Sequence, residues 1–418
     1  MRSTPAQPTA LRHLHGTPGF RRITLALFAS GLATFTTLYC VQALLPALSA
    51  RFGLTPAESS LAVSLGTAGL AVGVIPLTAL SGVIGRTFMM TASLFAAAVL
   101  GIAQAFSPTF AVLLVLRALQ GLALAGLQAT AMSYLAEEID RRSLGFAMGL
   151  YIAGNGIGGM AGRLIASFVL DLSNWRWALA VVGVLALLCA VVFRMNIVPS
   201  ANFVPSPPRV RHLAGGVGRS FTDSGLVRLF ACGFLLMGCF VTVYNYLGFR
   251  LLRPPFALAP VIVGLIFVVY LAGSVSSTVA GRLVDVLGRP RMLPVTALIT
   301  LAGIALMLPS NIVFVVIGLV VTTAGFFAAH SVASGWVGPR AATLNVQGPA
   351  VYLFCYYLGS SVGGSLGGLA YGSCGWPGVT VYVGALVLGV LILAFTLRKL
   401  PQAQPRRLTN SDVGQRSQ

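Results

Sequence analysis

Acidic residues are scarce in this chain of 418 residues, which has 8 Asp and Glu against 27 Lys and Arg. All charged residues together make up 8% of the chain, whereas soluble domains carry about 25%. Because 57% of the residues are hydrophobic, a water-soluble fold would lack the polar residues needed to cover its surface. The composition therefore predicts an integral membrane protein.

Several motifs are also missing, and each absence excludes a class of function. The six cysteines show no C-x-x-C spacing, so neither a metal site nor a disulfide framework is predicted. No G-x-x-x-x-G-K-[ST] motif occurs, so nucleotide hydrolysis is not the expected energy source. The sequence does not bring together a nucleophile, a general base and a residue that orients the base, as an enzyme would need. It also has no loop that resembles the selectivity filter of an ion channel. We therefore expect neither an enzyme nor an ion channel, and no cofactor.

Long apolar runs are abundant. A helix needs about 20 apolar residues to cross about 30 Å of hydrocarbon, and twelve segments qualify. They are residues 23–46, 59–80, 87–106, 109–135, 143–169, 175–194, 226–249, 258–281, 292–308, 311–335, 347–372 and 376–397. The alternation of a membrane β-barrel is missing, so the predicted fold is an all-α membrane protein with twelve transmembrane helices.

The basic residues are distributed unevenly between the two sides of the predicted bundle. A net charge of +19 would suit a nucleic-acid-binding protein, but 21 of the 27 Lys and Arg fall on the side of the N-terminus. This asymmetry follows the positive-inside rule. We therefore expect a multi-pass protein of the bacterial inner membrane, with both termini cytoplasmic, contacts to the lipid bilayer and no nucleic-acid partner.

Internal repeats divide the chain into two pseudo-symmetric halves. Gly281 to Arg291 form a charged loop between two spans, and a weaker copy lies at 81–86. Trp175 of the first half recurs as Trp376 in the second. Parallel repeats with a site between them are typical of secondary transporters. The expected organisation is a tail (1–22), a six-helix half (23–194), a linker (195–225), a second six-helix half (226–397) and a tail (398–418).

From about residue 20 to 400 the chain resembles the major facilitator superfamily. The family's loop signature, G-x-L-x-D-x-x-G-R-x-R, is met by Gly281, Leu283, Asp285, Gly288, Arg289 and Arg291. The copy in the first half keeps Gly85 and Arg86 but has Gly82 in place of the Asp. The resemblance implies the major facilitator fold, in which these loops make charge contacts that hold one conformational state.

The resemblance also suggests partners for the loop charges. We expect Asp285 to pair with Arg289 or Arg340, and Arg86 to pair with Glu137 or Glu138. The alternative is that these are ordinary solvated charges, each pair contributing ~0–1 kcal/mol.

Two further motifs resemble those of exporters in this family. Residues 117–121 are similar to the R-x-x-q-G signature of drug:proton antiporters, which is associated with proton coupling. Residues 154–159 are similar to G-P-x-x-G-G, with Asn155 in place of Pro. We expect Gly154, Gly158 and Gly159 to lie at close helix contacts, where missing side chains let two backbones approach and slide.

Few ionisable groups lie inside the predicted spans, and none is acidic. Arg117, with Gln120 on nearly the same helical face, could hold an anionic substrate or bias the pKa of a neighbour, or it could only form hydrogen bonds within the bundle. His330 could carry a proton, or it could be a neutral packing residue. Arg163 is expected to snorkel or to pair with Asp171.

The resemblance assigns the lining of a central cavity to spans 1, 4, 7 and 10. This places Tyr39, Gln42, Tyr244, Asn245 and Tyr246 as candidate substrate contacts, because aromatic residues with a polar tip suit an amphipathic ligand. Core packing would explain any one of them equally well.

These expectations describe a secondary active transporter that moves small molecules by alternating access, working by efflux in exchange for protons. The alternative is a proton-independent facilitator or importer of a small polar solute such as a sugar or organic anion, which Arg117 and the missing buried acid favour. A receptor that has lost transport is a further alternative. The family's usual form is a monomer.

Overall fold

The computed structural model describes residues 12–203, 210–344 and 346–399. Within these ranges the chain is built of helices, with one isolated bridge between His13 and Ile139 and no strand. Most of the two predicted tails lies outside the described residues. The predicted bounds of the two halves remain predictions, although α1 already begins at Pro18, inside the predicted N-terminal tail.

The first group of helices precedes residue 197. It comprises α1 (Pro18–Tyr39), η1 (Cys40–Leu44), α2 (Leu45–Phe52), α3 (Pro56–Ile84), α4 (Arg86–Gln104), α5 (Phe110–Glu138), α6 (Arg141–Leu172) and α7 (Trp175–Asn196). Local sequence sets where several of these helices begin. The side chains of Thr55, Thr109, Asp140 and Asn174 each accept a hydrogen bond from a backbone N–H in the first turn that follows.

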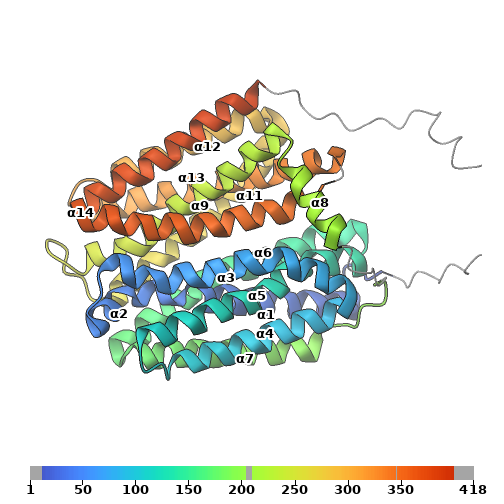
Figure 1. Ribbon diagram of the computed structural model, residues 1–418, viewed down its shortest axis with the longest axis horizontal. Helices are drawn as coiled ribbons and strands as arrows, with labels where there is room; N and C mark the ends of the chain where they lie inside the picture. Colours follow the sequence, from blue (N-terminus) through green and yellow to red (C-terminus); the bar gives the residue numbers. More distant parts are fainter. Residues whose placement is uncertain (1–11, 204–209, 345, 400–418) are drawn as a thin grey trace, which may run out of the picture.

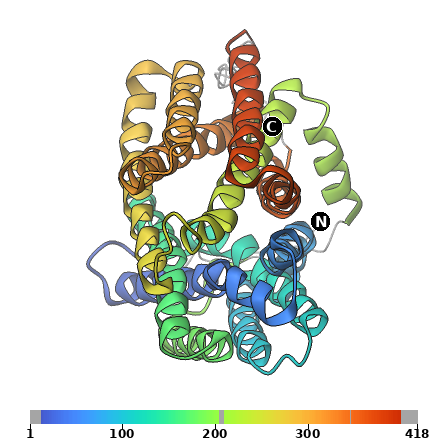
Figure 2. The ribbon, with the colours of Figure 1, turned by 90° about the vertical axis from the view of Figure 1, so that its left-hand side faces the viewer.

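The second group follows the linker, which contains a helix of its own, α8 (Val210–Ser220). The group comprises α9 (Ser224–Leu251), α10 (Pro260–Leu265), η2 (Ile266–Val269), α11 (Tyr270–Leu287), α12 (Arg289–Leu306), α13 (Ile312–Leu344) and α14 (Gly348–Arg398). Figure 1 shows the two groups as two layers of long helices, and Figure 2 shows them end-on, one bundle above the other and in contact with it.

The twelve predicted spans are confirmed. Ten helical segments of the described chain are long and apolar enough to cross a membrane. One of them, α14, contains two spans, because Gly375 (φ 61°, ψ −143°) breaks the helix in a conformation open to glycine alone. The remaining span is α6, whose 32 residues are long enough but whose many glycines and Asn155 make it less apolar.

The glycine motifs lie where two helices of the same half touch. A Cβ at Gly154 or Gly158 would collide with backbone atoms of α1, and a Cβ at Gly359 would collide with the backbone of α9. The same hydrogen bond then forms in each half. Thr36 Oγ1 donates to Gly158 O at 3.0 Å, and Thr242 Oγ1 donates to Gly363 O at 3.0 Å. The two halves thus repeat each other in atomic detail as well as in sequence.

The bundle has two faces. We call the face where α1 begins, α7 ends and α9 begins the linker face, and the opposite face the far face. Within the described chain, the hydrogen bonds that join the halves are central or toward the far face. There α3 packs on α14, with Ser365 donating to Ser64 at 2.8 Å, and α10 packs on α6, with Gly264 against Ser167. The halves are therefore joined at the centre and the far face.

Candidate functional site

A buried guanidinium lies at the centre of the interface between the halves. It belongs to Arg163 of α6, which is 1% exposed. Arg163 Nε donates to Gln42 Oε1 at 2.7 Å, and Nη1 donates to the carbonyl oxygen of Gly159. Nη2 has no hydrogen-bond partner among the described residues. Part of the guanidinium is therefore available to a further acceptor.

Four aromatic rings surround this guanidinium. The Arg163 Cζ atom lies 4.6 Å from the ring centre of Tyr270, 4.7 Å from Tyr39, 5.2 Å from Phe267 and 5.9 Å from Tyr244. Tyr39 comes from the first half and the other three rings come from the second. A desolvated cation–π contact contributes about 2 kcal/mol. The cation of one half is thus stabilised largely by rings of the other half.

An amide pair extends the site across the interface. Gln42 Nε2 donates to Asn245 Oδ1 at 2.7 Å, so that η1 and α9 are joined directly. Three polar atoms next to this pair are buried without a hydrogen bond of good geometry to a described residue: Tyr39 Oη, Asn245 Nδ2 and Ser360 Oγ, with the hydroxyl groups of Tyr39 and Ser360 facing each other. We call Tyr39, Gln42, Arg163, Asn245 and Ser360 the central cluster. Its unpaired polar atoms are what a polar ligand at this position would bind.

A break in the first span places Tyr39 and Gln42 at the centre. The α-helix ends at Tyr39 and continues as the 3-10 helix η1, which leaves carbonyl groups of the last turn without their usual partners. Arg117 of α5 takes over this role. It donates to the carbonyl oxygens of Thr37 and Leu38, and also to that of Ala62 on α3. Arg117 therefore holds the geometry that presents the central cluster.

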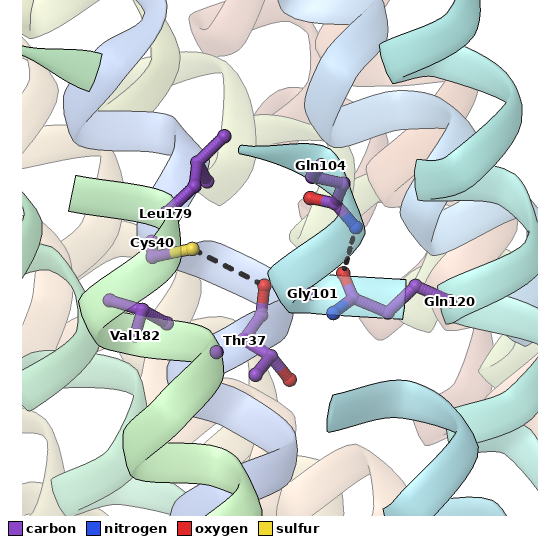
Figure 3. A pocket seen from close by; sticks show the side chains of 8 residues that line it. Thr37, Cys40, Gly101, Gln104, Gln120, Leu179 and Val182 are labelled. Atoms are coloured by element: carbon purple, nitrogen blue, oxygen red, sulfur yellow. Dashed lines mark hydrogen bonds between the residues drawn. The ribbon is translucent and has the colours of Figure 1, made fainter. Parts of the chain in front are cut away.

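A further hydrogen bond of Arg117 connects it to two glutamines inside the first half. Arg117 Nη1 donates to Gln120 Oε1 at 2.7 Å, and Gln104 Nε2 donates to the same oxygen at 2.9 Å. Figure 3 shows the glutamine pair beside a small pocket lined by Thr37 and Cys40. Arg117 is fully buried among α1, α3 and α5. Of the two interpretations of Arg117, its contacts match hydrogen bonding within the bundle.

His330 lies in the second half and contacts other aromatic residues. Its Nδ1 is 3.0 Å from Tyr352 Oη, and its ring centre is 4.5 Å from that of Tyr356. Thr323, on the same helix, bonds the hydroxyl of Tyr244 at 2.7 Å. The structure thus brings Tyr39, Gln42 and Asn245 together, with Tyr244 beside them. His330 lies outside this cluster, but the stacked rings of Phe326 and Phe240 connect it to Tyr244.

The expected role of Arg163 was wrong. Its guanidinium neither snorkels nor pairs with Asp171, because it turns inward and reaches back toward Gly159. One feature of the sequence could have predicted that Arg163 faces the interior of the bundle. Gly154, Gly158 and Gly162 pack their side of α6 against α1, so the residue after Gly162 lies beside a buried face and not a lipid-facing one.

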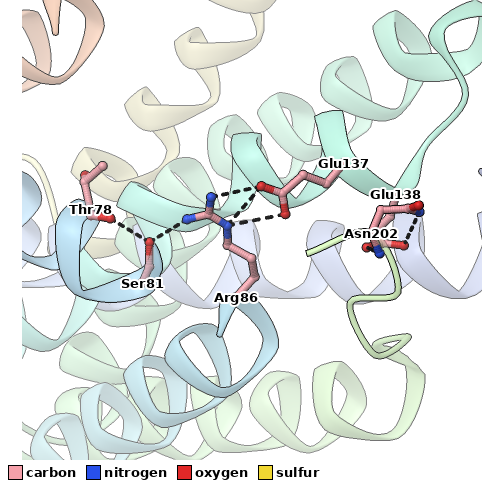
Figure 4. A network of polar contacts seen from close by, with 6 residues as sticks. All are labelled: Thr78, Ser81, Arg86, Glu137, Glu138 and Asn202. Carbon is pink, nitrogen blue, oxygen red and sulfur yellow. Dashed lines mark hydrogen bonds and ion pairs between the residues drawn. The ribbon is translucent and has the colours of Figure 1, made fainter. Parts of the chain in front are cut away.

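At the linker face, the described residues of the first half contain one charged pair. Arg86 donates to Glu137 at 2.9 Å and to Ser81 Oγ at 2.7 Å, as Figure 4 shows. The next residue, Glu138, is buried and accepts from the backbone and side chain of Asn202 in the linker. Of the two partners expected for Arg86, the structure therefore selects Glu137, and Glu138 anchors the linker.

In the second half, the expected pairing of Asp285 does not occur in this conformation. Arg340 instead binds Asp223, the N-cap of α9, at 2.6 Å. This hydrogen-bonded guanidinium holds the pKa of Asp223 below its usual value. Asp285 is exposed and forms no ion pair with any described residue. Each linker-face ion pair thus stays within its own half.

Two bundles of six spans, joined around a buried polar cluster, have the arrangement of a secondary transporter that binds its substrate between the halves. The chain belongs to the major facilitator superfamily, whose family model matches residues 26–253 and 229–417. The resemblance seen in the sequence is thereby confirmed. The protein is a transporter of small molecules, not an enzyme, and it spans the membrane several times.

Relatives support this membership along nearly the whole chain. The chain is 44% identical over 381 residues to the inner membrane transport protein YnfM of Escherichia coli, covering 91% of each protein. It is 42% identical over 392 residues to the uncharacterized MFS-type transporter YybF of Bacillus subtilis, covering 94% of this chain and 97% of YybF. The likeness to YnfM was visible in the segments 33–46 and 326–340.

A solved structure supports the fold. A bacterial homolog of the human lysosomal transporter Spinster, in an inward-facing and occupied conformation, superposes with a TM-score of 0.72. The alignment covers 92% of this chain and 97% of that chain at 16% identity, so the similarity supports the fold alone.

Proposed function

We propose that this protein carries small organic anions across the bacterial inner membrane by alternating access, as a monomer. The observation that supports this most directly is the buried, uncompensated cation of Arg163 between the halves. A positive charge in hydrocarbon is costly, so its retention calls for a function. A carboxylate entering the central cluster would neutralise this charge and bind the donors that now lack partners.

The distribution of acids supports an anionic substrate. Seven of the eight acids lie within two residues of a helix terminus, and the eighth, Asp412, is outside the described residues. A cationic substrate would therefore meet a fixed cation and no described carboxylate inside the spans. A carboxylate would instead find Arg163 Nη2, Asn245 Nδ2 and two hydroxyl groups, all of them hydrogen-bond donors.

The arrangement of the halves supports alternating access. They are joined at the far face, while each ion pair of the linker face stays within its own half. With the linker cytoplasmic, as the basic residues indicate, the halves are held together at the centre and on the side away from the cytoplasm. Substrate release on the other side would then require the contacts of α3 with α14 and of α6 with α10 to separate.

The proposal is tested with purified protein in proteoliposomes. We would measure uptake of a labelled panel of organic acids, sugars and lipophilic cations, with a pH dye inside the vesicles. Saturable uptake confined to organic acids is the expected result. Transport of lipophilic cations without transport of acids would contradict the assignment of Arg163 as the substrate-binding group.

Efflux in exchange for protons is the second candidate function. Its support is the signature at 117–121, which resembles that of drug:proton antiporters, together with His330. Among the four histidines of the chain, His330 alone lies in a span, and its hydrogen bond to Tyr352 offers a route for a proton.

Replacing His330 by glutamine distinguishes coupled from uncoupled transport. If His330 carries the proton, we expect the His330→Gln variant to keep substrate binding and to lose the substrate-triggered pH change inside the vesicles. The matched control is His15→Gln, because His15 precedes α1 and lies outside the spans. Substrate movement without any pH change in the unmodified protein would instead make it a facilitator.

Replacing Asp285 by asparagine tests the charged loop. Asp285 forms no ion pair with the residues that the structure describes, so its contacts would belong to the state closed at the linker face. We expect Asp285→Asn to abolish transport while leaving membrane insertion and substrate binding intact, measured by counterflow and by titration. Asp171→Asn, at an exposed acid near the far end of α6, is the control that should keep its rate. An unchanged transport rate in Asp285→Asn would show that Asp285 is not needed to close the linker face.

A further inference from the structure

The side chain of Gln42 contacts both the buried cation and the second half. It is 3% exposed and lies on η1. Its Oε1 atom accepts a hydrogen bond from Arg163 Nε at 2.7 Å. Its Nε2 atom donates to Asn245 Oδ1 at 2.7 Å and to the carbonyl oxygen of Val241 at 3.5 Å. A single amide group therefore connects the guanidinium of the first half with α9 of the second.

The orientation of this amide is fixed by the chemistry of its neighbours. A guanidinium can only donate hydrogen bonds and a backbone carbonyl can only accept them, so Gln42 must turn its oxygen to Arg163 and its NH2 group to Val241. Asn245 must then offer its own oxygen to Gln42. This leaves Asn245 Nδ2 as a buried donor without a partner of good geometry among the described residues, directed toward α14, where a Cβ at Gly364 would lie 3.2 Å from it. The two amides thus carry the donor character of Arg163 into the second half.

Gln42 accepts from Arg163 without neutralising its charge. A carboxylate at position 42 would be of nearly the same size and would reach the same Nε atom, but it would form a buried ion pair with the guanidinium. Every described acid lies within two residues of a helix terminus, so none of them takes that role. The neutral side chain at position 42 therefore leaves the charge of Arg163 to an incoming ligand.

We propose that Gln42 determines the charge selectivity of the central cluster. As an amide, it orients the guanidinium and keeps it able to bind a carboxylate. An acid at the same position would pair with the guanidinium and convert the cluster into a site for neutral solutes. Arg163 itself binds the anion, so Gln42 is a positioning residue that sets specificity. This proposal rests on the proposed transport of organic anions and assigns its charge selectivity to one residue.

The first test needs no ligand. Thermal unfolding of the purified full-length protein would be measured for Gln42→Glu alone and in the Arg163→Gln background. With Arg163 present, the new carboxylate compensates a buried cation, so we expect the unfolding temperature to rise. Without Arg163, the carboxylate is a buried charge with no partner, so we expect the unfolding temperature to fall. Shifts of the same sign and size in both backgrounds would show that the side chain at position 42 does not meet the charge of Arg163, and would overturn the proposal.

The second test compares two probes of the same shape and different charge. Benzoate carries a carboxylate, and benzamide carries a neutral amide in its place. In calorimetric titrations we expect the unmodified protein to bind benzoate at least about ten-fold more tightly than benzamide. In Gln42→Glu this preference should fall below about two-fold, because the guanidinium is already paired. Equal affinity of the unmodified protein for the two probes, binding of neither, or a full preference in Gln42→Glu contradicts the proposal.

Two matched variants separate charge from packing. Gln42→Met removes the hydrogen bonds of the amide but leaves Arg163 charged, so benzoate should bind more weakly while its preference over benzamide stays above about five-fold. Gln128→Glu places an acid on α5 beside Tyr151, about three turns of α6 before Arg163, and should keep the preference. A preference lost equally in Gln42→Met and Gln42→Glu would mean that Gln42 acts through its hydrogen bonds alone, which contradicts a role in charge selection.

A failure of this proposal differs from a failure of the proposed function. If Arg163→Gln loses organic-acid transport in vesicles while Gln42→Glu keeps it, Arg163 binds the anion and Gln42 does not set the selectivity. If the unmodified protein transports none of the organic acids in the panel, the proposed function is wrong, and the selectivity assigned to Gln42 is wrong with it, whatever the unfolding temperatures show.

Discussion

Replacing Arg163 by glutamine should reduce organic-acid transport at least about 100-fold without lowering the thermal stability of the purified protein. Loss of a charge-assisted contact to the substrate carboxylate explains the first effect. The second effect follows because no carboxylate compensates this buried charge, so a neutral side chain removes a desolvation cost along with the ring contacts. Counterflow rates and thermal unfolding of the same preparations would be measured side by side.

The control for this variant is Arg176→Gln. Arg176 also combines a carbonyl contact, to Ala105 at 2.9 Å, with an aromatic ring, that of Trp175 at 4.6 Å. It lies at the start of α7 and away from the central cluster, so its loss should leave transport intact. Near-normal transport in Arg163→Gln would contradict the proposed function.

The fold could be predicted from the sequence because its signals are local. Each span is a run of apolar residues, and the glycines of α6 and α14 recur at a fixed offset between the halves. The helix α8 was missed because the linker reads as polar, rich in glycine and proline, and carries no apolar run.

The site was predicted only in part. Tyr39, Gln42 and Asn245, which the structure brings together, were predicted because the family resemblance places their spans at the cavity. The role of Arg163 could not be found in this way, because its partners Phe267 and Tyr270 lie more than a hundred residues later in the chain. Only the packing of α10, η2 and α11 against α6 brings them together.

The two buried arginines have different surroundings, which implies different roles. The hydrogen bonds of Arg117 all go to groups of its own half. Arg163 is surrounded mainly by rings of the opposite half, which must change neighbours when the halves rock. The contacts of Arg117 therefore do not depend on how the two halves are placed, and they fix the shape of one half. The contacts of Arg163 do depend on that placement.

Replacing Arg117 by alanine should, on this basis, impair stability and transport together. The carbonyl groups of Thr37, Leu38 and Ala62 would lose their donor, at a cost of about 1–3 kcal/mol each. We expect the protein to insert into the membrane but to unfold about 10 °C earlier. Transport should be lost, because nothing then stabilises the change from α1 to η1 that places Tyr39 and Gln42 at the centre.

Arg117→Lys separates the charge from the geometry of the guanidinium. Lysine keeps the positive charge but cannot reach several carbonyl groups from a single planar fork, so we expect an intermediate unfolding temperature and a partial loss of transport. Circular dichroism melting and counterflow rates on purified protein would measure both. If Arg117→Ala lost transport yet melted like the unmodified protein, Arg117 would instead act in the transport cycle itself, as the antiporter signature implies.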